Sequence, residues 1–154
     1  MTYDELLVES DEAGLDTREL PLIAYDGRIK GRRIAIRASI PTLKQKGCVL
    51  AEELGHYHTS CGDILQLRSG ADRLQEMRAR RWGFDHMIGL DGILRAYEAR
   101  CRSAYEMAEL LDVTEDYLKE ALDYYRGRYG TSPVRYRSYL IYFSPLAVIK
   151  LLND

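Results

Sequence analysis

The chain has 154 residues, enough for one domain with a buried core, and its 46% hydrophobic and 30% charged residues are typical of a globular protein. The formal net charge of −2 argues against a general affinity for nucleic acid, and no apolar run approaches the ~20 residues that a membrane span requires. The amino terminus is acidic and has no signal-peptide pattern, and the three cysteines are widely spaced. We therefore expect a cytoplasmic protein without a disulfide framework, direct nucleic-acid binding or membrane association.

The first part of the chain predicts a helix followed by a β-hairpin. Apolar residues recur among acidic ones over residues 3–13, and Gly14 is a helix stop signal, so this segment predicts a short amphipathic helix. Apolar residues alternate with polar ones over 25–29 and 32–37, with Gly31 between the two runs. This pattern predicts two antiparallel strands joined by a tight turn.

Basic residues cluster on the predicted hairpin. The cluster consists of Arg28, Lys30, Arg32, Arg33 and Arg37. We interpret it as a solvated strand face in preference to a nucleic-acid contact, because the chain as a whole is slightly acidic.

The middle of the chain predicts three helices. Thr42 is a suitable N-cap for a helix over residues 43–59. Residues 65–70 are expected to form a loop, and helical periodicity returns over 71–88 and 91–100.

The last part of the chain predicts a pair of short helices within residues 103–126. Ser103, with Glu106 three residues later, forms a capping-box pattern, and Thr114 is the expected N-cap of the second helix. Two short helices with a tight turn resemble a helix-turn-helix, but the second helix is acidic where a DNA-reading helix needs Arg, Lys, Asn or Gln. We therefore interpret the pair as structural.

Two further segments follow this helix pair. Residues 136–143 are rich in aromatic and branched side chains and predict a strand, which we expect to join the hairpin. Residues 146–152 form a short apolar tail that suits either a helix or a strand.

Within the helix predicted over residues 43–59, Glu52 and His56 stand four residues apart and therefore share a face, with Glu53 beside them. In the H-E-x-x-H motif, residues at these two positions bind zinc, and the Glu after the first ligand is the general base. Here the first ligand position holds Glu52 instead of His. The alternative interpretation has Glu52 and Glu53 as solvated helix residues and His56 as a helix-end residue.

Three stretches of the chain together resemble the ImmA/IrrE family of zinc metallopeptidases. Residues 48–57 (CVLAEELGHY) are similar to the A-H-E-L-G-H-type run of that family, and residues 76–84 (EMRARRWGF) to its following helix. Residues 108–114 (AELLDVT) are similar to a helix pair common in the family, and residues 1–7 look like the opening of its short prophage and mobile-element members.

The resemblance implies a site, a cofactor and a substrate class. It implies that Glu52, His56 and Glu76 hold Zn²⁺, with Glu53 as general base. Two carboxylate ligands also admit Mn²⁺ or Fe²⁺. The resemblance further implies an endopeptidase that acts on a transcriptional repressor of a prophage or mobile element and so relieves repression.

The expected fold is α+β: a mostly helical, zincin-like metallopeptidase domain with a small antiparallel sheet and a C-terminal helix pair. One domain is expected over residues 1–154, including the helix pair at 103–126 and the strand at 136–143.

Glu52 is the departure from the family pattern, and it changes the expected chemistry. With Glu52, His56 and Glu76 as ligands, two carboxylates cancel the charge of a divalent ion, and a neutral centre acidifies water less. The sequence therefore predicts a slower enzyme with an alkaline-shifted pH optimum. His58 can substitute as a ligand only if the helix ends at Tyr57.

Two other functions remain open at this stage. The chain can be an inactive member of the family that regulates a repressor by binding it. Less favoured is a small DNA-binding regulator built on the helix pair at 103–126.

Overall fold

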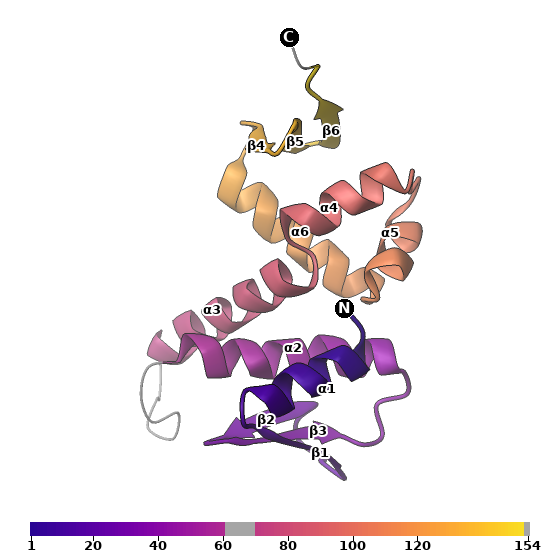
Figure 1. Cartoon of the computed structure of the whole chain (residues 1–154). Coiled ribbons are helices and arrows are strands. Elements are labelled where there is room, and N and C mark those ends of the chain that lie inside the picture. Colours follow the sequence, from indigo (N-terminus) through magenta and orange to yellow (C-terminus); the bar gives the residue numbers. More distant parts are fainter. Residues whose placement is uncertain (61–69, 153–154) are drawn as a thin grey trace.

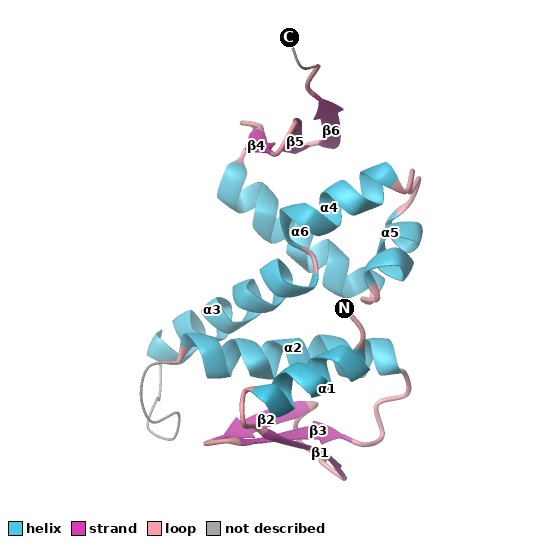
Figure 2. Ribbon diagram, viewed as in Figure 1, coloured by secondary structure: helices cyan, strands magenta, loops and turns pink. Residues whose placement is uncertain are grey.

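The computed structural model describes residues 1–60 and 70–152, and within them the chain is α+β (Figures 1 and 2). The first element, α1 (Tyr3–Glu12), begins at Thr2 with a full capping box: the Thr2 hydroxyl accepts from the Glu5 backbone, and the Glu5 carboxylate accepts from the Thr2 backbone. The helix is followed by Gly14 with φ +75°, a conformation that favours glycine. The predicted amino-terminal helix is therefore confirmed.

Three strands form sheet A: β1 (Asp16–Leu20), β2 (Gly27–Lys30) and β3 (Arg33–Arg37), in the order β1-β3-β2. The predicted hairpin is confirmed, because β2 and β3 are antiparallel and Gly31 lies in their turn with φ +60°. The expected small antiparallel sheet is extended here to a mixed sheet by one further strand. β1, which was not predicted, pairs in parallel with β3, and its chiefly exposed residues lack the alternation that marks a half-buried strand.

The helix that carries the motif, α2 (Leu43–Thr59), has the predicted bounds. Thr42 caps it by accepting a hydrogen bond from the Gln45 backbone. Figure 1 shows α1 and α2 lying together on one side of sheet A. Leu50 and Leu54 of α2 are fully buried in the hydrophobic core, which also contains the inward-facing isoleucines of β2 and β3.

The next helix, α3 (Gly70–Met87), packs along α2 with its backbone unusually close. A Cβ added to Gly55 of α2 would collide with the carbonyl oxygen of Ala79, and one added to Gly83 would lie 2.9 Å from the Tyr117 hydroxyl. Such close approach requires residues without a side chain at these positions. The loop expected over residues 65–70 lies outside the described residues, except that residue 70 begins α3.

Three further helices, α4 (Gly89–Glu98), α5 (Ala104–Leu111) and α6 (Glu115–Tyr129), complete the helical layer. Ser103 and Thr114 cap α5 and α6 as predicted, although Glu106 reaches back to the Arg102 backbone instead of to Ser103. α6 runs past its expected end because a single glycine inside a helix costs only about 1 kcal/mol.

A second sheet, sheet B, consists of β4 (Val134–Tyr136), β5 (Tyr139–Phe143) and β6 (Leu146–Lys150) in that order, all antiparallel. The prediction that the strand over 136–143 joins the hairpin is wrong. Figures 1 and 2 show sheet B at the opposite end of the molecule from sheet A. The reason is packing: the Phe143 ring lies 5.2 Å from that of Tyr125 and 5.3 Å from that of Tyr129, both in α6.

One hydrophobic cluster extends from Tyr3 in α1 to Phe143 in β5, so the layers share a core. Among the helices described, none has the length and apolar character needed to cross a membrane.

Candidate metal centre

Glu52, His56 and Glu76 come together between α2 and α3. Each offers one ligand atom, and these three atoms all lie within 4.8 Å of one another. His56 Nε2 lies 3.3 Å from Glu76 Oε1. These are the three residues that the family resemblance implied as metal ligands.

The geometry follows from the two helices. Glu52 and His56 share a face of α2 because they are one turn apart. Glu76 belongs to α3, and the close packing at Gly55 and Ala79 brings α3 near enough for its carboxylate to reach the imidazole. A short motif on one helix thus becomes a three-ligand group only through the helix–helix contact.

The group opens to solvent on the α3 side. The side chain of His56 is 12% exposed, whereas that of Glu76 is 56% exposed. The exposed fraction of the Glu52 side chain is intermediate, so exposure increases from His56 through Glu52 to Glu76. The ligand group is therefore most accessible to solvent at Glu76.

Glu53 is buried next to this group, on the side of α2 that faces β2. Burial, and then the negative charges of Glu52 and Glu76, raise the pKa of Glu53 to about 8, against the opposing effect of a hydrogen bond with the Ile29 backbone. Gly27 of β2 leaves the space that this carboxyl group occupies, because a Cβ there would lie 2.8 Å from Glu53 Oε1. The side chain is thus held in a fixed place with a raised affinity for a proton.

Arg80 is a part of the site that sequence reasoning missed. Its Nε lies 3.5 Å from Glu52 Oε2, and its second guanidinium nitrogen lies 3.1 Å from Glu120 Oε2. The spacing of Glu76 and Arg80, four residues apart on a helix, was the available signal, because it places both on the same face of α3. Arg80 offsets part of the negative charge at the unusual ligand Glu52.

His58 does not belong to the metal-binding group. Its ring stacks on Trp82 at 4.6 Å, and Trp82 in turn stacks on His86 at 4.4 Å. The His86 Nε2 lies 2.7 Å from Glu9 Oε2, so this stack links α1, α2 and α3. α2 continues to Thr59, which leaves His58 on another face from His56.

The donor set fits a divalent cation. Neighbouring ligand atoms around tetrahedral zinc lie about 3.4 Å apart, which is close to the distance between the His56 and Glu76 atoms. The remaining separations between ligand atoms are within 4.8 Å. An imidazole with two carboxylates suits zinc and also the harder ions manganese and iron.

Comparison with protein-family models, with curated proteins and with solved structures finds no match to this chain. The kind of site is therefore inferred from the side chains that form it. It is a three-ligand Glu–His–Glu group that can hold a metal ion, with a buried carboxyl group beside it.

Proposed function

We propose that this chain is a zinc-dependent endopeptidase of the ImmA/IrrE type. The observation that carries the proposal is the assembly of Glu52, His56 and Glu76 from two helices, with Glu53 buried directly beside the first ligand. A metal held by one imidazole and two carboxylates, next to a carboxyl group that accepts protons, is a hydrolytic arrangement.

In this mechanism the metal ligands and Glu53 have separate roles. Glu52, His56 and Glu76 would hold the ion, which when bound supplies Lewis acidity toward water and a substrate carbonyl. The positive charge of a bound ion would lower the pKa of Glu53, and the ionised carboxylate would then take a proton from the attacking water and give it to the leaving amine. Sheet A and Gly27 keep Glu53 in position and away from bulk water.

We further propose that the substrate is a transcriptional repressor of a prophage or mobile element, and that cleavage occurs in the cytoplasm. The open side of the site at Glu76 supports a protein substrate, because an exposed segment of a folded partner can reach it. The repressor itself comes from the family resemblance.

Cleavage of a quenched fluorescent peptide library tests the peptidase activity. We expect cleavage with added zinc, its loss with a chelator, and a loss of at least about 100-fold for Glu53→Gln. Glu12→Gln is the matched control, since Glu12 is an exposed carboxylate in α1. Equal cleavage by wild type and Glu53→Gln would exclude Glu53 as the base.

Comparison of new protein amino termini in host cells that express wild type or Glu53→Gln identifies the substrate. We expect cuts within a DNA-binding repressor only in cells with the wild type. New termini confined to unrelated proteins would contradict the repressor as substrate.

A second candidate function is binding without cleavage, and one observation favours it. Arg80 lies against Glu52 and competes with a cation for that carboxylate. In this case the wild type retains a repressor in a pull-down but neither binds metal nor cleaves peptides.

A further inference from the structure

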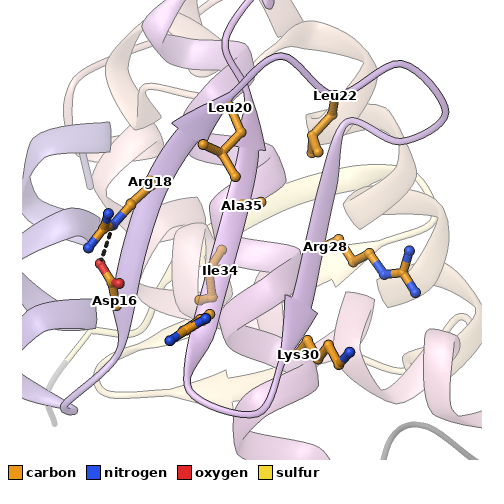
Figure 3. Close-up of a pocket in the computed structure, with 9 residues that line it drawn as sticks. Asp16, Arg18, Leu20, Leu22, Arg28, Lys30, Ile34 and Ala35 are labelled. Carbon is orange, nitrogen blue, oxygen red and sulfur yellow. Dashed lines mark hydrogen bonds and ion pairs between the residues drawn. The ribbon is translucent and has the colours of Figure 1, made fainter.

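Sheet A covers the motif helix with one face and leaves the other face open. α1 and α2 lie on the inner face, and no described element lies on the outer face (Figure 2). The outer face contains a hollow of about 570 Å³, drawn in Figure 3. Its lining residues are Asp16, Arg18, Leu20, Leu22, Arg28, Lys30, Arg33, Ile34 and Ala35.

Strand register explains both the hollow and its charge. Ala35 of β3 pairs with Arg18 of β1 on one side and with Arg28 of β2 on the other. The short alanine side chain leaves a floor between two arginines that stand about 10 Å apart, two strand spacings. In Figure 3 Ala35 lies between the strands that carry Arg18 and Arg28.

The cations of this face are mostly without acidic partners. Arg18 pairs with Asp16 at 2.9 Å, but Arg28, Lys30 and Arg33 have no carboxylate within ion-pair distance among the residues described. Lys30 is directly opposite Arg33 in the antiparallel pair. Like charges at opposite positions of a sheet cost stability, so a bound anion would relieve repulsion that the free sheet retains.

One end of the hollow is apolar. Leu20, which is 42% exposed, and the half-buried Leu22 both lie at this end, beyond Arg18, Arg28 and Lys30 (Figure 3). A peptide with both carboxylates and apolar side chains can contact the cations at one end and the leucines at the other. A nucleic acid would instead place charged phosphates against the leucines. The lining residues themselves include no aromatic ring on which bases could stack, and the neighbouring Tyr25 ring is covered by the Arg28 guanidinium at 5.4 Å.

The charge of the rest of the chain also favours a short acidic partner. The four cations and Asp16 sum to +3, and the whole chain carries −2, so the remainder carries −5. A long polyanion would be repelled by that remainder, while an acidic segment of a few residues meets only the basic face.

We propose that the outer face of sheet A binds an acidic polypeptide segment with leucine-like residues, supplied by a partner protein. The acidic side chains pair with Arg28, Lys30 and Arg33, and the apolar ones pack on Leu20 and Leu22. This docking surface lies on the other side of the sheet from Glu53, because successive side chains of β2 point to opposite faces. It therefore exists independently of any peptidase activity.

Fluorescence anisotropy with a labelled peptide of alternating glutamate and leucine tests the proposal. We expect binding at low salt that weakens toward ~0.15 M salt, and a loss of affinity of at least about tenfold for the double variant Arg28→Glu with Lys30→Glu. The Lys30→Glu change creates an opposite-charge pair with Arg33, so the variant should keep its fold. The double variant Arg18→Ala with Arg33→Ala removes two other cations of the same face. It should therefore also weaken binding of the peptide.

The matched control reverses two exposed strand cations of sheet B, Arg135→Glu with Lys150→Glu, and should bind as the wild type does. Three binding results would overturn the proposal. They are no binding of the peptide at low salt, equal binding by the Arg28/Lys30 variant, and tighter binding of oligothymidylate than of the peptide. Self-association of the chain that the same variant abolishes would also overturn it, because the occupant would then be a second copy.

Discussion

Position 52 distinguishes the candidate metal centre of this chain from a two-histidine zinc site. Glu52 gives the ligand group a second carboxylate, and Arg80 lies 3.5 Å away and offsets part of the added charge. Because two carboxylates cancel the charge of a divalent ion, an ion bound here would acidify water less than one held by two imidazoles.

Replacing Glu52 by His should therefore increase activity at neutral pH. The loss of one negative charge should move the pH optimum of peptide cleavage toward neutrality and raise the rate at pH 7 by about tenfold, the equivalent of one pKa unit. A pH–rate profile of the two proteins measures this, with Glu12→His as control. An unchanged optimum would contradict the charge argument.

The raised pKa of Glu53 predicts how the stability of the metal-free protein depends on pH. Its ordinary pKa of 4.5 rises to about 8 in the folded state, so between these values the native chain keeps a proton that the unfolded chain has released. The free energy of unfolding must then fall as pH rises through this window, with the full loss above it, on the order of 5 kcal/mol. Glu53→Gln removes this loss, because an amide does not titrate.

Urea unfolding with a chelator present, at about pH 5 and about pH 8, checks this prediction. Glu53→Gln should be more stable than wild type at the higher pH and similar at the lower. The same difference between the two proteins at both pH values would contradict the raised pKa.

Among individual residues, sequence reasoning predicted the three side chains that come together and missed their surroundings. Spacing on one helix placed Glu52 and His56 together, and the family resemblance added Glu76. The contact of Gly27 with Glu53 joins a strand to a helix, and no local pattern encodes such a pairing.

The contact between α2 and α3 is the element on which the site depends. Their backbones meet where Gly55 lies against Ala79, and this approach places Glu76 beside His56. The sequence pattern predicted both helices well, because periodicity and the Thr42 cap are local signals. It could not predict how closely they pack.

Gly55→Ala should push the two helices apart. We expect a loss of stability of about 1–3 kcal/mol from overpacking, together with weaker metal binding as His56 and Glu76 separate. Gly127→Ala is the matched control in α6, since nothing lies within 4 Å of the added Cβ, and it should stabilise by up to about 1 kcal/mol. Thermal unfolding and zinc titration of both variants measure these effects, and unchanged zinc affinity in Gly55→Ala would contradict the role of this contact.

At the scale of the whole molecule, strand pairing was the main failure of sequence reasoning. The segment around Phe143 has a clear strand pattern, but the pattern does not specify a partner strand. Packing on α6 places this strand in sheet B, far from sheet A. The α+β class was confirmed, because it depends only on the kinds of element present.

The continuous core predicts that the chain unfolds as one unit. Phe143, 1% exposed, packs in sheet B, whereas Trp82, the only tryptophan, reports on the stack between α2 and α3. Phe143→Ala should lower stability by about 3–5 kcal/mol, and Trp82 fluorescence should show the same shift as circular dichroism. Ile149→Ala, at an exposed position of β6, is the control. If the unfolding midpoint reported by Trp82 fluorescence is unchanged in Phe143→Ala, the two ends of the molecule unfold separately.

The metal content of the purified protein, measured by elemental mass spectrometry, tests the central claim most directly. We expect about one zinc ion per chain in the wild type after zinc is supplied, and none in His56→Ala, which lacks the least exposed ligand. His86→Ala is the matched control, because that histidine pairs with Glu9 outside the ligand group and should leave the zinc content unchanged. A wild type that takes up no metal, or a His56→Ala variant that binds it equally, would contradict the metal centre described here.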